Sequence, residues 1–435
     1  MDGVDRLCAL AYADDVVLLA DSQEELQQLV DVVCEWCRKW RLQLNVKKTK
    51  VMVFGHRGSA QAAVFVEGEQ LEQVEEFRYL GMLFHQDGRV GWKCAKEHML
   101  RKARRASFAV WGLLLRLGGM SVRGMTNMWT ALIRPHLEYG AEVVGVQWEE
   151  AERLQLRVAR RVLKCGKRVP NAALMGELGW LSLRARRMRL RLAFWAKLLE
   201  MPPTRWPRRL YELGRRNMSP WCRETKEVLG VLGLGPSWDL QNVPPGWLWE
   251  MEARVQDWHL QQWNIEVLNS PKLALLATLG PVFGPQEYLG EPVQKWRRLW
   301  TKLRSGALEL RVETGRWERL PVDGKQAALP RELRRCELCS LETEDERHFL
   351  FRCPAYELER RIFMYVCSGT RDAGDAVRGA AECLASGKPL VTGEDELLVW
   401  MMQSGWRQSM QYLASVWYKR KTLRKELGIQ GILEQ

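Results

Sequence analysis

Residues 7–22 read LCALAYADDVVLLADS and place two adjacent carboxylates, Asp14 and Asp15, between two short apolar runs. Apolar runs of this length around an acidic turn predict a β-hairpin formed by residues 7–13 and 16–20. An isolated acidic turn is most often an ordinary solvated turn. Because both flanking runs are apolar here, we expect the hairpin to lie centrally in a sheet, with the two carboxylates where the sheet ends.

The pair Asp14 and Asp15 also predicts a chemistry. Two adjacent carboxylates repel each other, and divalent cations relieve that repulsion. Mg²⁺ favours carboxylate oxygens combined with substrate phosphates. Two such ions roughly 4 Å apart can activate a 3′-hydroxyl and stabilise a leaving pyrophosphate. Both residues are therefore candidate Mg²⁺ ligands in a two-metal polymerase site.

Capping signals and hydrophobic spacing predict the next elements. A capping box at Ser22 to Glu25 precedes apolar residues at helical spacing, which predicts an amphipathic helix over residues 23–41. Cys34 and Cys37 lie on this helix, and core packing is the better interpretation because no further ligand is near. Strands or hairpins are predicted for residues 51–54, 63–74 and 77–84, and helices for residues 93–118, 121–133 (ending at Pro135) and 416–428.

The net charge of +13 is concentrated in one segment. Residues 151–220 hold 18 Lys and Arg against four Glu, a local balance of +14, with Trp180, Trp195 and Trp206 interleaved. Arginine predominates, and its paired donors suit phosphate recognition. The segment is therefore a candidate nucleic-acid backbone contact, and the alternative is a solvated helical face with its Trp side chains in the core. The candidate contacts are Arg157, Arg160, Arg161, Arg184, Arg186 and Arg187.

A second motif, CELCSLETEDERHFLFRC, has the spacing Cys336-x2-Cys339-x8-His348-x4-Cys353. Three thiols and one imidazole satisfy a tetrahedral structural Zn²⁺. Because protein side chains fill all four positions, we expect this ion to be structural rather than catalytic. Arginines near the motif are available for phosphates, but the surrounding acidic residues dilute that field. A protein-facing or purely structural role therefore stays open.

The order of the motifs resembles a known family. AYADD between apolar strands resembles the catalytic hairpin of reverse transcriptases, and three later segments agree in order: LQLNVKKTKVMVFG (42–55), VEEFRYLGMLFHQDG (74–88) and LIRPHLEYGAEVVG (132–145). Together they are similar to the non-LTR retrotransposon (LINE-type) reverse transcriptases over residues 1–215. The resemblance returns at residues 331–365, which are similar to a C-terminal zinc element that this family links to nucleic-acid binding.

The resemblance implies roles at the catalytic site. Asp14 would bind the catalytic metal, Asp15 would support the same site, and Tyr12 would lie near the primer end. Lys48 belongs to a segment that matches the family's N-x-x-K-T element. It would neutralise or protonate the leaving pyrophosphate, where charge develops; an ordinary surface lysine is the alternative.

The resemblance also implies a primer-binding region. Tyr79, Leu80 and Gly81 would form the hairpin that grips the primer strand; the alternative is a plain core strand with a glycine bend. The basic helix that follows would begin the thumb and would face the template–primer. Its candidate contacts are Lys102, Arg104 and Arg105.

The implied fold is α+β. It consists of an incomplete reverse-transcriptase palm, an antiparallel sheet with a helix, followed by a mainly α-helical thumb and a C-terminal region with a small zinc-binding domain. The expected divisions are a partial palm (1–90), thumb-like helices (91–149), a basic, Trp-rich, mainly helical connector (150–330), and the zinc-binding domain with C-terminal helices (331–435).

The resemblance also implies that something is missing. The family's site needs a further metal-binding Asp from a strand well upstream of the hairpin, together with the fingers. Asp2 and Asp5 are too close to Asp14 to belong to that strand, and Asp21 follows the hairpin. Two ions held by one hairpin would be poorly positioned. We therefore expect that the chain alone does not polymerise DNA, and that its partners are RNA, DNA and a separate N-terminal polymerase part.

Two alternatives to a polymerase part stay open. One is a non-enzymatic, zinc-dependent RNA/DNA-binding protein derived from such an element, and the other is a non-functional relic.

No apolar run reaches the roughly 18 residues that a membrane span needs, and the N-terminus lacks the features of a signal peptide. We therefore expect an intracellular protein without a membrane partner, in the nucleus or in a cytoplasmic ribonucleoprotein by resemblance.

Overall fold

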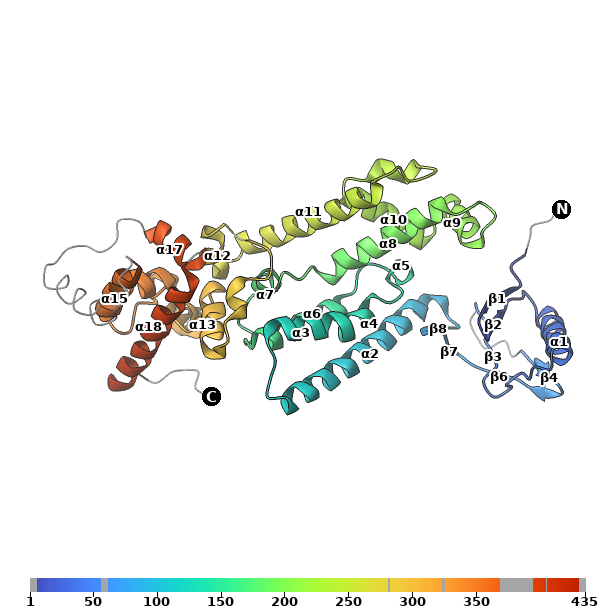
Figure 1. The fold of residues 1–435 in the computed structure, drawn as a ribbon, viewed down its shortest axis with the longest axis horizontal. Helices are drawn as coiled ribbons and strands as arrows, with labels where there is room; N and C mark the ends of the chain where they lie inside the picture. Colours follow the sequence, from blue (N-terminus) through green and yellow to red (C-terminus); the bar gives the residue numbers. More distant parts are fainter. Residues whose placement is uncertain are drawn as a thin grey trace. The chain divides into compact units, whose positions relative to one another are not determined.

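The computed structural model describes residues 6–55, 62–280, 282–322, 325–367, 394–403 and 405–429. These residues are mostly helical, and their strands form two-stranded sheets (Figure 1). Contacts divide the chain into two compact units: a first unit of Met1–Ala109, Leu132–Ala151 and Leu183–Val255, and a second unit of Val110–Ala131, Glu152–Ser182 and Gln256–Gln435. The mixed fold class is confirmed, whereas the assignment of palm and thumb stays a prediction. No described helix is both long and apolar enough to cross a membrane.

The hairpin predicted at the acidic pair is present. Strands β1 (Ala9–Tyr12) and β2 (Asp15–Leu18) pair antiparallel, with Tyr12 opposite Asp15. The expected central, buried position is wrong within the described chain, because the two strands pair only with each other. Tyr12 and Val16 are 66% and 51% exposed. Apolar flanks show that these side chains favour burial, but the described residues supply no flanking strand to cover them.

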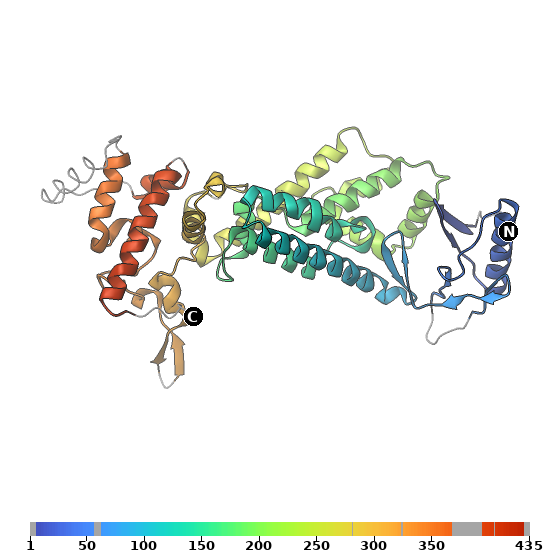
Figure 2. The ribbon, with the colours of Figure 1, turned by 60° about the horizontal axis from the view of Figure 1, so that its bottom comes forward.

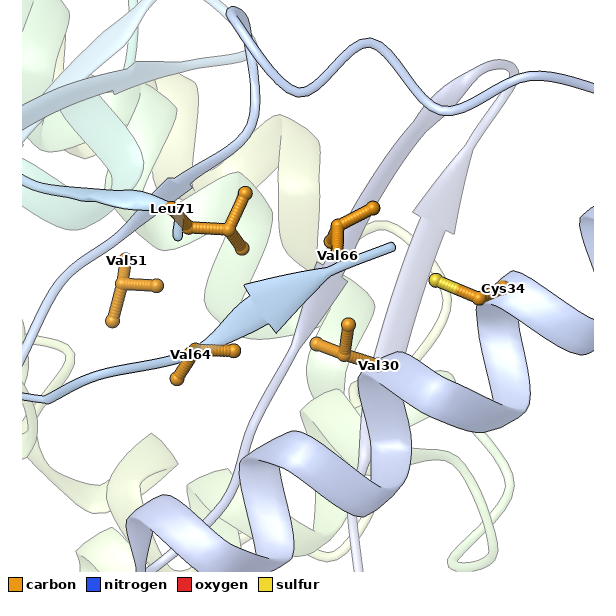
Figure 3. Close-up of a cluster of buried hydrophobic side chains, with 6 residues drawn as sticks. All are labelled: Val30, Cys34, Val51, Val64, Val66 and Leu71. Atoms are coloured by element: carbon orange, nitrogen blue, oxygen red, sulfur yellow. The ribbon is translucent and has the colours of Figure 1, made fainter. Parts of the chain in front are cut away.

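Helix α1 (Gln23–Lys39) begins at the predicted cap, where the Ser22 side chain accepts a hydrogen bond from the Glu25 amide. Its inner face carries Val30 and Cys34, which point toward the strand that carries Val64 and Val66 (Figure 3). Cys34 and Cys37 are both buried free thiols, so their predicted core packing is confirmed. The full buried cluster is Val30, Cys34, Val51, Val64, Val66 and Leu71.

Short strands follow where the sequence predicts them. β3 (Lys50–Val51) pairs with β6 (Glu72–Gln73), β4 (Phe65–Val66) with β5 (Glu69–Gln70), and β7 (Glu76–Tyr79) with β8 (Met82–His85). The β4–β5 and β7–β8 pairs are antiparallel, but the β3–β6 pair is parallel. A parallel pair needs a crossover, and the chain between β3 and β6 supplies it, including the β4–β5 hairpin. The expected antiparallel pairing is therefore confirmed for β4–β5 and β7–β8, and β3–β6 departs from it.

Helix α2 (Gly88–Arg116) covers residues 93–116 of the helix predicted over 93–118, and the next predicted helix, over 121–133, differs from the structure at its end. Helix α3 (Val122–Met128) continues through a π-helical turn, η1 (Trp129–Ile133), into α4 (Arg134–Glu138). Pro135 therefore lies in the first turn of α4 rather than beyond the helix. Proline has no N–H to donate, so one helical hydrogen bond is absent at Pro135, directly after the π-helical turn.

The remaining elements are helical except for one hairpin. Figure 2 shows that hairpin, β9 (Arg319–Val322) with β10 (Lys325–Ala328), projecting from the second unit (brown). The other α-helices are α5 (Ala141–Val144), α6 (Glu149–Leu163), α7 (Asn171–Leu178), α8 (Leu183–Glu200), α9 (Trp206–Arg216), α10 (Pro220–Val231), α11 (Trp247–Leu268), α12 (Ala274–Thr278), α13 (Gln294–Arg304), α14 (Arg311–Thr314), α15 (Glu357–Cys367), α17 (Glu394–Gln403) and α18 (Trp406–Glu426). The other short helical turns are η2 (Gly235–Asp239), η3 (Pro271–Leu273), η4 (Glu287–Gly290), η5 (Gly315–Trp317), η6 (Arg331–Leu333), η7 (His348–Arg352) and η8 (Pro354–Tyr356).

Tryptophan forms much of the helical core. In the first unit the Trp195 ring stacks on Trp238 and packs against Trp247, and its Nε1–H donates to the Tyr211 hydroxyl. In the second unit Trp129 stacks on Trp180 at 5.3 Å. The alternative interpretation of the basic segment, with Trp side chains in the core, is therefore correct for Trp180 and Trp195.

Helix α11 carries a buried histidine, His259, which makes the free energy of unfolding decrease at acid pH. The His259 ring is 6% exposed and packs edge-on against Phe283 at 5.1 Å. This burial lowers the pKa of His259 to about 4. Its pKa in an unfolded chain is about 6.5, so protons bind the unfolded chain more readily between these two values.

We expect His259→Phe to reduce the acid sensitivity of folding. The wild-type contribution is fully present above about pH 6.5 and is lost as the pH falls toward 4, which amounts to about 2 kcal/mol between pH 7 and pH 5. Urea unfolding at the two pH values measures it. An equal loss of unfolding free energy in the wild type and the variant would contradict this assignment.

Candidate functional site

The two-residue turn Ala13–Asp14 presents the acidic pair at the tip of β1–β2. Ala13 has a φ of 53°, in the left-handed region that non-glycine residues rarely adopt. Asp14 lies in the turn, and Asp15 opens β2 directly opposite Tyr12. The side chains of Tyr12, Asp14 and Asp15 are all exposed. Within the described residues, neither aspartate joins a third ligand-type side chain in a compact group.

The N-x-x-K-T element forms a single tight turn. The Asn45 side chain accepts a hydrogen bond from the Lys48 amide at 3.2 Å, and the Asn45 carbonyl accepts from the Thr49 amide and hydroxyl, both at 3.0 Å. Asn45 and Thr49 therefore shape the backbone. The Lys48 side chain is left exposed, as both its predicted role and a surface lysine require.

Residues Tyr79 to Met82 make a tight turn between β7 and β8. Leu80 and Gly81 both have positive φ, 45° and 82°, which is the geometry of a two-residue hairpin turn. The Tyr139 hydroxyl donates a hydrogen bond to the Leu80 carbonyl. A Cβ at Gly81 would lie 3.5 Å from the Tyr139 hydroxyl, so the ring rests on the glycine. Tyr139 thus secures the predicted primer-grip turn, a role that sequence reasoning missed.

Helix α8 holds the segment that carries Tyr139. The Arg187 guanidinium donates to the Gly145 carbonyl at 2.6 and 2.9 Å and to the Leu137 carbonyl at 2.6 Å. Arg186 pairs with Glu138. Residues 137–145 are therefore fixed on both sides of Tyr139 by α8.

This arrangement corrects one candidate phosphate contact. Arg187 is fully buried, and all of its described hydrogen bonds go to backbone carbonyls, so it holds the fold together instead of facing a ligand. Burial, with a smaller contribution from Arg191, lowers the pKa of Arg187 to about 10, which leaves it charged at neutral pH.

The other five candidates differ in exposure. Arg157 and Arg161 are exposed on α6, and the Arg161 guanidinium lies over the Trp111 ring at 5.3 Å. Arg160 is half-buried and donates to the Asn171 side chain at 2.6 Å. Arg184 and Arg186 are half-buried on α8. Among these five candidates, only the two arginines of α6, Arg157 and Arg161, are exposed.

Helix α2, which follows the predicted primer-grip turn in the sequence, exposes a basic face. Arg101, Arg104 and Arg105 are exposed at i, i+3 and i+4 spacing, which places them on one side of the helix. Lys102 is half-buried. The structure thus leaves two of the three predicted contacts, Arg104 and Arg105, available to a ligand.

The Cys/His motif forms a compact cluster in the second unit. The ligand atoms of Cys336, Cys339, His348 and Cys353 all lie within 4.8 Å of one another. The Cys339 Sγ is 3.3 Å from His348 Nε2, and the Cys336 and Cys353 Sγ atoms are 3.9 Å apart. Four donors of this type in this space fit a tetrahedral Zn²⁺.

The surroundings of this cluster also suit a metal. His348 Nδ1 lies 3.4 Å from the Glu342 carboxylate, which would hold the Nδ1 proton and leave Nε2 as the ligand. Hydrogen bonding from Cys353, and to a smaller extent from His348, lowers the pKa of Cys336 to about 3. One thiol thus ionises readily, whereas hydrogen bonding to that thiolate raises the pKa of Cys353.

The arginines around the cluster are engaged with protein groups. Arg352 pairs with Glu394, Arg347 with Asp395, and Arg334 donates to backbone carbonyls. These contacts favour the structural or protein-facing interpretation of the motif over phosphate binding.

Comparison with known proteins identifies the N-terminal region. Residues 3–84 match the family described as reverse transcriptase (RNA-dependent DNA polymerase). The chain is similar to the reverse transcriptases of non-LTR retrotransposons. The match includes the acidic hairpin, the N-x-x-K-T turn and the predicted primer-grip turn, whereas the Cys/His cluster lies outside it. No solved structure matches the chain.

The curated relatives are much longer than this chain. It is 25% identical over 179 residues to a probable RNA-directed DNA polymerase from transposon BS of Drosophila melanogaster, covering 38% of this chain and 20% of that protein. The corresponding polymerase from transposon X-element of the same species is 23% identical over 177 residues, covering 38% and 19%. The RNA-directed DNA polymerase from mobile element jockey of Drosophila funebris is 25% identical over 144 residues, covering 31% and 15%. The chain therefore spans about a fifth or less of these relatives.

We expect Tyr139→Phe to loosen the primer-grip turn without unfolding the unit. The Leu80 carbonyl loses its donor while Leu80 stays in its left-handed conformation. Hydrogen exchange of the amides at 79–82 should rise about threefold to tenfold, equivalent to about 0.7–1.4 kcal/mol. The amides of β1–β2 serve as an internal reference. Unchanged exchange at 79–82 would show that the phenol does not secure the turn.

Proposed function

We propose that this chain is part of an RNA-directed DNA polymerase of a non-LTR retrotransposon, in which its N-terminal residues bind Mg²⁺ and a template–primer. The observation that carries the proposal is the acidic hairpin. Asp14 and Asp15 are exposed at the tip of a two-residue turn inside the segment that matches the reverse transcriptase family.

The proposed site would use this chain's residues in distinct ways. Asp14 and Asp15 would hold Mg²⁺, which supplies activation of the primer hydroxyl and stabilisation of the pyrophosphate. Lys48 would neutralise charge on the leaving pyrophosphate. Tyr12, next to the turn, and the turn at Leu80 would position the primer strand.

Within the described residues, the β1–β2 hairpin carries only two carboxylates, those of Asp14 and Asp15. Asp21 is the next acidic residue along the chain, and it pairs with Arg6. Because catalysis here depends on positioning two ions together, we propose that the chain alone binds nucleic acid without polymerising it. This supports a binding function as the second candidate for the isolated chain.

Primer extension with the purified chain tests this proposal. We expect no Mg²⁺-dependent nucleotide incorporation above that of an Asp14→Ala variant. Incorporation that the Asp14→Ala substitution abolishes would overturn the claim of inactivity and would at the same time support the assignment of Asp14 as a ligand.

The exposed arginines of α6 support a phosphate contact. Arg157 and Arg161 lie one helical turn apart on the same face, about 6 Å along the axis, and Arg153 extends the same stripe. Such a row of guanidinium groups can follow a nucleic-acid backbone through charge-assisted hydrogen bonds.

We expect the double variant Arg157→Gln and Arg161→Gln to weaken template–primer binding in a salt-dependent manner. Loss of two phosphate contacts should reduce the slope of log affinity against log salt by about 2. Fluorescence anisotropy over a range of salt concentrations measures it. A matched control replaces two exposed arginines elsewhere, Arg223→Gln and Arg407→Gln. Equal slopes in the two double variants would remove the α6 face from the binding surface.

We also propose that Cys336, Cys339, His348 and Cys353 hold one structural Zn²⁺. The Cys353→Ala variant should bind one Zn²⁺ fewer per chain and should melt at a lower temperature, because metal binding and local folding are linked. Metal analysis by mass spectrometry and thermal denaturation measure both effects. Cys8→Ala is the control that removes a thiol outside the cluster. A folded Cys353→Ala protein with undiminished zinc would refute the assignment.

A further inference from the structure

A second group of metal-ligand side chains lies at the open end of the β7–β8 hairpin in the first unit. The donor atoms of Glu76, His85 and Cys94 all lie within 4.8 Å of one another. They come from three elements: β7, β8 and α2. The group lies outside the proposed catalytic residues and in a different unit from the Cys336 cluster.

The fold explains why these three side chains meet. Glu76 and His85 are directly opposite in the antiparallel register of β7 and β8, so both point to the same face. Helix α2 begins at Gly88, shortly after β8 ends, and Cys94 lies in its second turn. The Cys94 thiol hydrogen bonds to the Glu76 carboxylate. The spacing of nine residues between successive members has no familiar motif, which is why His85 alone suggested nothing in the sequence.

An unsatisfied imidazole lies one helical turn beyond this group. His98 is four residues after Cys94 on α2, so the two side chains share a face of the helix. The His98 Nε2 atom is buried and has no hydrogen-bond partner among the described residues. The Glu76 carboxylate interacts electrostatically with the His98 ring. Buried ring nitrogens normally have a partner, so this one is open to a ligand.

We propose that Glu76, His85 and Cys94 form a Zn²⁺ site, and that the His98 side chain, which lies outside this compact group of three, moves toward the ion to complete a tetrahedral set. A thiolate, imidazoles and a carboxylate are the donors that Zn²⁺ takes in proteins. Mg²⁺ and Ca²⁺ prefer oxygen ligands, so this mixed set disfavours them. The ion would clamp the hairpin that carries the predicted primer-grip turn onto the start of α2.

Zinc binding here exchanges two existing hydrogen bonds. Cys94 loses its thiol proton to solvent, and Glu76 turns from accepting that proton's hydrogen bond to ligating the ion. His85 Nδ1 now accepts from the Asp87 amide at 2.9 Å. The ion either takes this lone pair or takes Nε2 after the ring proton moves to Nδ1. In both cases the Asp87 amide loses its acceptor, so its hydrogen exchange should rise when zinc binds.

The test measures zinc content in the full chain. The double variant Cys336→Ala and Cys353→Ala, which lacks the other cluster, should retain one tightly bound Zn²⁺ per chain after gel filtration. Adding Cys94→Ala should reduce this to none, whereas adding Cys8→Ala should leave it at one. Where the double variant fails to fold, the comparison is made in the wild-type background, and Cys94→Ala should bind one Zn²⁺ fewer than Cys8→Ala. Equal zinc content in the Cys94→Ala and Cys8→Ala proteins, in either background, would overturn the proposal.

Two further measurements identify the ligands. With Co²⁺ in place of Zn²⁺, the thiolate-to-metal absorption that depends on Cys94 should appear in the double variant and vanish in Cys94→Ala. His98→Gln should weaken zinc binding at least about tenfold. Unchanged affinity in His98→Gln would overturn the role of His98, and absence of the Cys94-dependent Co²⁺ band would overturn the site. Neither result bears on template–primer binding by α6, so this proposal and the proposed function fail separately.

Discussion

The interaction on which the first unit most depends is the buried guanidinium of Arg187. It reaches from α8 to the carbonyls of Leu137 and Gly145, at the two ends of the segment that contains Tyr139. A charge in this position is costly unless its hydrogen bonds are satisfied, and each such bond contributes about 1.5–3 kcal/mol. Residues 137–145 consequently have little freedom to move, and the Tyr139 hydroxyl is delivered to the Leu80 carbonyl.

The buried position of Arg187 shows that the positive charge of residues 151–220 does not lie entirely on the surface. The local balance of +14 suggests a surface, yet Arg187, Arg191 and Arg208 are buried. Arg191 pairs with Glu224 at 2.7 Å, and Arg208 donates to two carbonyls at the end of α8. Part of the arginine content therefore serves helix packing, where a planar fork of donors can satisfy carbonyls from several segments at once. Fewer arginines of residues 151–220 are therefore available to a ligand than the composition of the segment implies.

The sequence predicts local features of this protein well. The acidic hairpin, the cap of α1 and the core role of Cys34 all follow from patterns within about 20 residues. The Cys336 cluster could also be predicted, because its spacing brings the donors together within one short segment. Long-range features could not be predicted. The contact between Tyr139 and Leu80 spans 59 positions, and the meeting of Glu76, His85 and Cys94 depends on strand register and on the direction in which α2 leaves the hairpin.

Burial was the property least accessible from sequence. Apolar runs around Asp14 and Asp15 correctly gave the strands, but whether those strands are covered depends on what packs against them. The same limit applies to arginine. Its long side chain can be solvated or buried, and the sequence does not show which of the two occurs. Hydrophobic patterning reports the preference of a side chain, and only the three-dimensional neighbours decide whether that preference is met.

Both hairpins that carry proposed functional residues are two-stranded, and such hairpins are marginally stable alone. They differ in how they are supported. The β7–β8 turn is pinned by Tyr139, and through it by α8, so its left-handed Leu80 is held in place. The β1–β2 turn has no comparable contact at its tip in the described chain, and its strained Ala13 lies between exposed neighbours. Local stability should therefore be lower at the acidic turn than at the primer-grip turn. The proposed site, which would bring metal ligands and a primer together, would then become ordered from the β7–β8 hairpin outward. The acidic turn would become ordered only when a ligand or a further segment covers its apolar strands.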